Sequence, residues 1–207
     1  MPASSALLLK RRAFLLALPT VATAARADDL LALVRAARGQ VGVTLRYAPA
    51  YARLAYPGGD VPPDRGVCTD VVIRAYRAAY GCDLQRLVHE DMASAFGAYP
   101  KIWGMKQPDS NIDHRRVPNL QTFLARRKAS LPVSSRGADY LPGDLVTQML
   151  PGNAPHIMIV SDRRRGDGLP LVIHNIGLGA REEDWLFGAS VTGHYRFAPP
   201  KQAKITG

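Results

Sequence analysis

Residues 64–72 read Asp64-Arg65-Gly66-Val67-Cys68-Thr69-Asp70-Val71-Val72 and connect an irregular, Gly- and Pro-rich segment to a helical pattern. Apolar residues recur at helical spacing over residues 69–80, and Gly81 is a typical residue just beyond a helix C-terminus. The pattern therefore places Cys68 at a helix N-terminus, where the positive end of the helix dipole favours thiolate over thiol. Because the thiolate is the nucleophilic form, this position indicates a reactive cysteine.

The patterns on either side of this helix predict an α+β fold. Helical spacing recurs in three further segments, at residues 30–40, 84–98 and 117–128, with Asp28 or Asp29 as the expected cap of the first. Short β-rich runs follow near the C-terminus, at residues 144–149, 156–161, 171–175 and 191–197. Helices followed by a set of short consecutive strands are typical of helices packed on an antiparallel sheet.

The N-terminal segment has the features of an export signal. Lys10-Arg11-Arg12 precedes an apolar run at residues 13–18, and Ala25-Arg26-Ala27 fits an A-x-A cleavage site. Arg11 and Arg12 with the Phe14-Leu15 that follows resemble a twin-arginine signal. A membrane anchor is the weaker interpretation, because the apolar run is shorter than the roughly 20 residues that cross a bilayer. We therefore expect a signal peptide over 1–27 and a periplasmic or otherwise exported protein, with no membrane anchor after cleavage.

Length and composition fit a single globular domain over residues 28–207. Of the 207 residues, 47% are hydrophobic and 21% charged, which is typical of a domain with its own core. The formal net charge is +10, and it falls to +6 once Lys10, Arg11, Arg12 and Arg26 leave with the signal. An exported basic protein rarely meets nucleic acid, so the expected neighbour is a polyanionic cell wall or membrane surface. A charge that serves only solubility is the equal alternative.

The second cysteine, Cys82, is not expected to pair with Cys68. The helix between them, at a rise of about 1.5 Å per residue, would hold them about 20 Å apart. A disulfide needs Cα atoms within about 7 Å of one another. Cys82 is therefore expected to be a small buried hydrophobic residue.

Two histidines stand where the predicted strands would bring them together. His156 opens one β-rich run and His174 closes the next, with an Arg- and Gly-rich turn at residues 163–168 between them. In an antiparallel pair joined by a turn, the start of one strand lies beside the end of the other. A cysteine hydrolase needs a base and a group that orients this base. We expect His156 to be the base, oriented by His174 or by the neighbouring Asn175.

The order of cysteine on a helix, then histidine and a polar residue on strands, resembles the papain-like fold, and the local words resemble its NlpC-type branch. These words are Tyr56-Pro57-Gly58-Gly59, Pro142-Gly143-Asp144-Leu145-Val146, His156-Ile157-Met158-Ile159-Val160 and Val172-Ile173-His174. The whole mature chain resembles, more specifically, a bacterial exported family catalogued as a domain of unknown function and related to NlpC-type peptidases. The words behind this second resemblance are Gly66-Val67-Cys68-Thr69-Asp70-Val71, Val88-His89-Glu90-Asp91-Met92, Asn111-Ile112-Asp113-His114-Arg115-Arg116-Val117-Pro118-Asn119-Leu120 and Gly193-His194-Tyr195-Arg196.

The resemblance implies a monomeric thiol amidase or endopeptidase that needs no cofactor and acts on peptide bonds, typically in the peptide stems of peptidoglycan. Cys68 would attack the carbonyl, and its backbone N–H would contribute to an oxyanion hole. His156 would act first as base and then as the acid that protonates the leaving amine. His174, or Asn175 in its place, would orient His156, and Tyr56 would line the site.

Two departures from the NlpC pattern lie near the predicted nucleophile. The family word Asp-Cys-Ser-Gly is replaced by Val67-Cys68-Thr69-Asp70, and Met158 stands where the family has Gly. Asp70 is expected to oppose thiolate formation through its like charge. It is nonetheless included among the candidate substrate-binding residues, together with Tyr56, His114, Arg115 and Asn175.

His114, Arg115 and Arg116 form a basic run, and arginine suits the recognition of the carboxylates that peptidoglycan stems carry. A solvated basic face or a helix cap is the alternative for this run.

Three other functions remain open at the level of sequence. A thiol acyltransferase would share the covalent intermediate and transfer the acyl group to an amine or hydroxyl. A non-catalytic wall-binding protein would keep only the fold. Cys68, His156 and His174 could also ligate Zn²⁺, although no closely spaced ligand pair supports a metal site.

Overall fold

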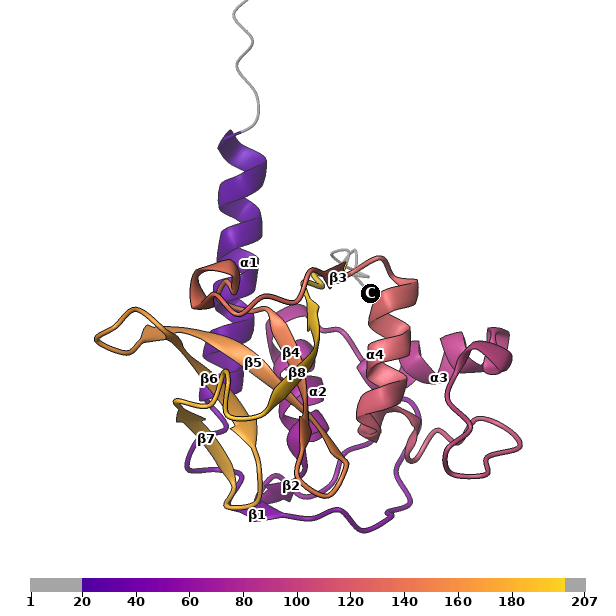
Figure 1. The fold of residues 1–207 in the computed structure, drawn as a ribbon. Coiled ribbons are helices and arrows are strands. Elements are labelled where there is room, and N and C mark those ends of the chain that lie inside the picture. The colour runs from indigo at the N-terminus through magenta and orange to yellow at the C-terminus, as the bar shows by residue number, and fades with distance from the viewer. Residues whose placement is uncertain (1–19, 200–207) are drawn as a thin grey trace, which may run out of the picture.

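The computed structural model describes residues 20–199, and their side chains from residue 28 onward. Within this part of the chain, helices and an antiparallel sheet of six strands form an α+β fold, as predicted (Figure 1). The predicted signal peptide lies outside the described residues as far as residue 19. None of the helices described between residues 20 and 199 has both the length and the apolar character needed to cross a membrane.

The helices and strands have the following bounds. The α-helices are α1 (Thr20–Arg38), α2 (Cys68–Tyr80), α3 (Leu84–Ser94) and α4 (Val117–Arg126), and three 3₁₀ turns occupy Phe96–Ala98, Asp113–Arg115 and Gly137–Asp139. The strands are β1 (Arg46–Tyr47), β2 (Arg65–Gly66), β3 (Ser130–Leu131), β4 (Leu145–Leu150), β5 (Ala154–Arg164), β6 (Pro170–Asn175), β7 (Ala180–Glu183) and β8 (Ser190–Tyr195).

The six-stranded sheet has the order β3-β8-β4-β5-β6-β7 with every neighbour antiparallel. Helices α1, α2 and α4 pack against its strands, and α3 packs on α2 and α4. The main core lies between helices and sheet, where Ile157 and Ile159 of β5 join the apolar faces of α2 and α4. A smaller core forms around Met158 and Val160, which alternate with them along the strand.

Most predicted elements are present, and the start of the first helix is the main correction. Helix α1 begins at Thr20 and runs past Asp28 and Asp29, so neither aspartate caps it, because the Ala-rich residues before them have high helix propensity. Helix α2 ends at Tyr80, and the φ of 63° at the following Gly81 is the left-handed conformation expected there. Strands β1, β2, β3 and β7 are short elements that the sequence pattern did not predict.

Candidate functional site

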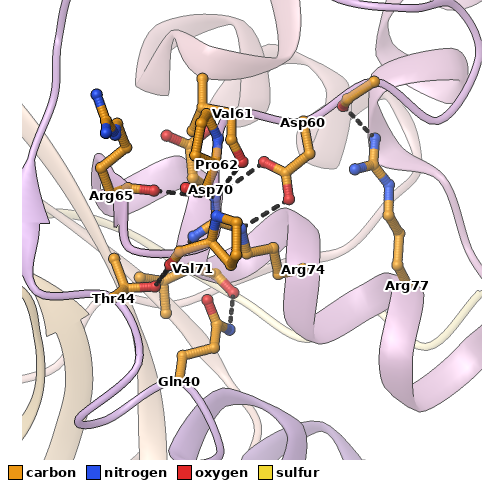
Figure 2. Close-up of polar contacts among 12 residues, drawn as sticks. Gln40, Thr44, Asp60, Val61, Pro62, Arg65, Asp70, Val71, Arg74 and Arg77 are labelled. Carbon is orange, nitrogen blue, oxygen red and sulfur yellow. Dashed lines mark hydrogen bonds and ion pairs between the residues drawn. The ribbon is translucent and has the colours of Figure 1, made fainter.

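Cys68 is the first residue of α2, as predicted. Side chains of α2 make hydrogen bonds to the segment that precedes Cys68. The Val67 N–H donates to Oδ2 of Asp70 at 2.7 Å, which satisfies a backbone donor at the helix start. Arg74, one turn further along α2, donates to Asp60 through two nitrogens at 2.7 and 3.0 Å. It also donates to the carbonyl oxygens of Val61 and Arg65 at 3.0 and 2.9 Å (Figure 2). The planar guanidinium therefore fastens the incoming segment to the helix that carries the cysteine.

Asp70 and Arg115 form a buried, two-pronged ion pair behind Cys68. Nε and Nη2 of Arg115 each lie 3.0 Å from one oxygen of the Asp70 carboxylate, and both side chains are buried. Nη2 of Arg115 also donates to the Ala48 carbonyl at 3.0 Å. The two predicted substrate-binding residues thus engage one another and the backbone, which gives them a structural explanation.

Cys68 is only 4% exposed, and burial raises the pKa of its thiol to about 11. Backbone hydrogen bonds from Ile157, Thr69 and Cys68 itself act in the opposite direction, and the Asp70 charge adds to the increase, as predicted. The expectation that the helix dipole would favour the thiolate is therefore corrected, because desolvation outweighs the helix N-terminus. The resting cysteine is a thiol, so catalysis would require a base.

His156 and His174 are neighbours, as the hairpin argument predicted. Nε2 of His156 lies 2.7 Å from Nδ1 of His174, and both rings are buried. Nε2 of His174 in turn lies 2.9 Å from Oε1 of Glu183 on β7. The sequence pattern did not identify Glu183, because its approach depends on the pairing of His174 with Arg181 across β6 and β7.

This chain of contacts determines which nitrogens carry protons. A carboxylate accepts only, so Nε2 of His174 is the donor to Glu183. In neutral His174, Nδ1 is then the acceptor, and Nε2 of His156 donates to it. Nδ1 of His156 is left unprotonated, which is the form that a general base requires.

His156 is neutral at physiological pH. Burial and the neighbouring His174 charge lower its pKa to about 3. No described residue donates a hydrogen bond to Nδ1 of His156. This nitrogen is also not one of the fully buried atoms that lack a partner. The backbone of Ile157, the residue after His156, acts on the Cys68 thiol and lowers its pKa against the larger effect of burial. No direct hydrogen bond joins this thiol to the imidazole, and such catalytic contacts often tighten only when substrate binds.

A pocket of about 360 Å³ opens at Cys68, within the range of ligand-binding sites. Tyr47 lies in it because β1 and β2 pair in parallel and place Tyr47 beside Gly66, two residues before the cysteine. The remaining lining residues are Pro49, Val67, Trp103, Ile112, Arg115, Arg116, Val117, Pro118, Ala154 and Pro155. Strand β1, which contributes Tyr47, and the loop that contributes Trp103 are far from Cys68 in sequence, so no local pattern indicated them.

Of the predicted site residues, only Cys68 and Arg115 line this pocket, whereas His156, His174 and Asp70 lie outside its lining. The three other predicted residues have different contacts. Tyr56 packs edge-on against His89, with ring centroids 5.1 Å apart, and does not line the pocket. His114 is buried outside the pocket with its Nδ1 unpaired, and burial lowers its pKa to about 3. Asn175 donates to the Gly66 carbonyl at 3.0 Å, so His174 is the residue in contact with His156 and Asn175 supports the strand before Cys68.

The two cysteines are both free and buried. Across residues 20–199, no cluster of three His, Cys, Asp or Glu side chains has the arrangement of a metal site. His156 and His174 direct nitrogens at one another rather than at a common point. This geometry does not favour the zinc alternative.

The fold and the site define an α+β protein with a buried cysteine at a helix N-terminus and a His-His-Glu chain of hydrogen bonds on the sheet. The protein belongs to the family described as Domain of unknown function (DUF1287), which matches residues 34–197. It is 54% identical over 181 residues to the Uncharacterized protein YijF of Escherichia coli (strain K12), covering 87% of this chain and 88% of that protein. No solved structure matches the chain. The predicted membership of a domain-of-unknown-function family is confirmed, and the kinship with NlpC-type peptidases stays a prediction.

Proposed function

We propose that this protein is an exported cysteine amidase or endopeptidase with a papain-like arrangement of Cys68, His156 and His174. The observation that carries the proposal is the hydrogen-bonded chain from His156 through His174 to Glu183. It leaves Nδ1 of His156 unprotonated, and the backbone of the next residue, Ile157, acts on the Cys68 thiol and lowers its pKa. A buried thiol that cannot ionise alone, next to an oriented neutral imidazole, suits general-base activation.

In the proposed reaction, Nδ1 of His156 takes the Cys68 proton as the sulfur attacks the substrate carbonyl. The imidazolium that forms is stabilised through His174 by the Glu183 carboxylate. The Cys68 N–H would stabilise the oxyanion, and the Tyr47 hydroxyl, which belongs to a residue lining the same pocket, is a second candidate donor. His156 then returns the proton to the leaving amine, and water hydrolyses the acyl-enzyme.

The peptide stems of peptidoglycan are the proposed substrate. The net charge of +6 without the predicted signal favours a polyanionic wall, and the pocket has room for a short peptide segment. The sequence motifs around Tyr56, Cys68 and His156 resemble those of NlpC-type enzymes, and this resemblance supports the same substrate class.

Digestion of purified peptidoglycan sacculi tests this proposal. The wild type and Cys82→Ala should release new amino termini and alter the muropeptides seen by mass spectrometry, whereas Cys68→Ala and His156→Ala should release none. Cys82→Ala is the matched control, because it removes the other buried thiol. Full activity of His156→Ala would contradict the assigned base. A mass increase on Cys68 that water does not discharge but an added amine does would indicate the acyltransferase instead.

A further inference from the structure

Arg116 differs from the other arginine that lines the Cys68 pocket. Its guanidinium carbon lies 4.2 Å from the centre of the Trp103 ring, and one of its nitrogens contacts the sulfur of Met105. Among the described residues, no carboxylate lies within ion-pair distance of Arg116, whereas Arg115 is fully engaged by Asp70. The pocket therefore contains a half-buried cation whose charge no side chain neutralises directly.

The wall of the pocket around Arg116 is also electropositive. Arg116 is the N-cap of α4, and this helix has neither a capping side chain nor an acidic residue in its first turn. Its first residues, Val117 and Pro118, line the same pocket as Cys68 at the start of α2. Two helix N-termini thus border one pocket, and each favours negative charge.

The positive charge of Arg116 is only partly compensated by its surroundings, and its pKa is therefore shifted. Burial outweighs the attraction of the more distant Asp113 and Asp109 and lowers the pKa of Arg116. A ligand carboxylate could accept two parallel hydrogen bonds from the planar guanidinium and compensate its charge. Stacking on Trp103 limits the orientations of this group, so that less conformational freedom is lost on binding.

We infer that Arg116, held against Trp103, binds a free carboxylate of the substrate close to the amide bond that Cys68 attacks. This inference rests on the proposed amidase function and narrows it to peptides that carry an unmodified carboxyl group beside the scissile bond. Amidation of that carboxyl group would remove the charge and one acceptor while leaving the peptide almost the same size. The enzyme would therefore discriminate between acidic stems and their amidated counterparts.

Binding and hydrolysis of matched peptides separate the two proposals. The probes are the stem peptide L-Ala-γ-D-Glu-L-Lys-D-Ala and its analogues in which each carboxyl group is amidated in turn. Isothermal titration of Cys68→Ala should show that one amidation weakens binding about tenfold or more. In Cys68→Ala with Arg116→Gln, the same amidation should change binding less than twofold. Arg116→Lys should keep part of the discrimination, because its charge remains and its planar donors are lost.

Arg164→Gln is the charge-matched control, because Arg164 lies at the exposed end of β5, donates to the Gly168 carbonyl and is outside the pocket. It should leave the discrimination intact. An equal effect of amidation with and without Arg116, or no binding of any peptide, overturns the inference. Discrimination by Arg116 without hydrolysis by the wild type leaves the carboxylate site standing and rejects the amidase. Hydrolysis at the same rate with and without amidation supports the amidase and rejects the carboxylate site.

Discussion

Nε2 of His156 lies 2.7 Å from Nδ1 of His174, and neither residue is more than 2% exposed. Two buried imidazoles at this distance must share one proton between the facing nitrogens. The position of that proton depends on a third residue, because Glu183 accepts from the far side of His174. The carboxylate on β7 therefore determines the tautomer of a histidine that it does not touch.

Glu183 is expected to act as a positioning residue. Its hydrogen bond and charge raise the pKa of His174, against the larger lowering by burial. Glu183→Ala should therefore destabilise the imidazolium that forms on His156 during the reaction. We expect kcat to fall about 10- to 100-fold with little change in KM. Glu183→Gln should recover part of the rate, because its amide oxygen still accepts from His174. Asp184→Ala, in the next position and exposed, is the control in the same assay of amine release, and an equal loss there would refute the assignment.

Alkylation of Cys68 should be slow at neutral pH. Because burial raises the pKa of Cys68 to about 11, the thiolate fraction should rise about tenfold for each pH unit between pH 7 and 10. The rate of iodoacetamide labelling in Cys82→Ala, where Cys68 is the only cysteine left, should follow this increase. A midpoint below pH 8 would show instead that the free enzyme holds a thiolate–imidazolium pair.

The sequence predicted those parts of the site that follow from short-range rules. Helix α2, which begins at Cys68 and is followed by Gly81, depends on spacing along one segment, and the contact of His156 with His174 follows from one hairpin. Tyr56 was not located correctly, since the word around it matches a family pattern while its ring packs on His89.

The remaining features depend on segments that meet only in the folded chain. Tyr47 reaches the pocket through the parallel β1–β2 pair, and Trp103 through a loop that has no periodic pattern. The sign of the Cys68 pKa shift was wrong for the same reason. A helix N-terminus can be inferred locally, but the desolvation that outweighs it comes from the whole core.

Removal of Arg115 should destabilise the fold because it leaves Asp70 buried without its counter-ion. Arg115→Met should lower the free energy of unfolding by about 3–5 kcal/mol, as measured by urea denaturation. Asp70→Asn in the same chain should recover part of the loss, since it removes the unpaired charge. Arg165→Met breaks exposed pairs with Asp167 and Asp184 and should cost less than about 1 kcal/mol. Equal losses for the two arginine variants would contradict the structural role of the buried pair.

Acid should destabilise this protein before its carboxylates titrate. The pKa values of His114 and His156 are about 3 in the folded chain and about 6.5 in an unfolded one. Below pH 6.5 the unfolded chain therefore binds protons that the folded chain does not, and the free energy of unfolding falls as pH decreases toward 3. Each histidine contributes a slope of at most about 1.4 kcal/mol per pH unit.

His114→Gln isolates one of these contributions without altering the residues that line the Cys68 pocket. Urea denaturation at pH 7.0, about 6 and about 5.5 should give a shallower pH dependence for this variant than for the wild type, because the unfolded chain gains one proton fewer. Against the opposing effect of burial, hydrogen bonds from His194 and Arg196 hold the pKa of Asp144 below its usual value. Burial raises the pKa of Asp113, and this contribution is common to both proteins, so the difference between their slopes reports His114. Parallel slopes for the two proteins would mean that folded His114 takes up a proton as readily as the unfolded residue, contrary to its burial with an unpaired Nδ1.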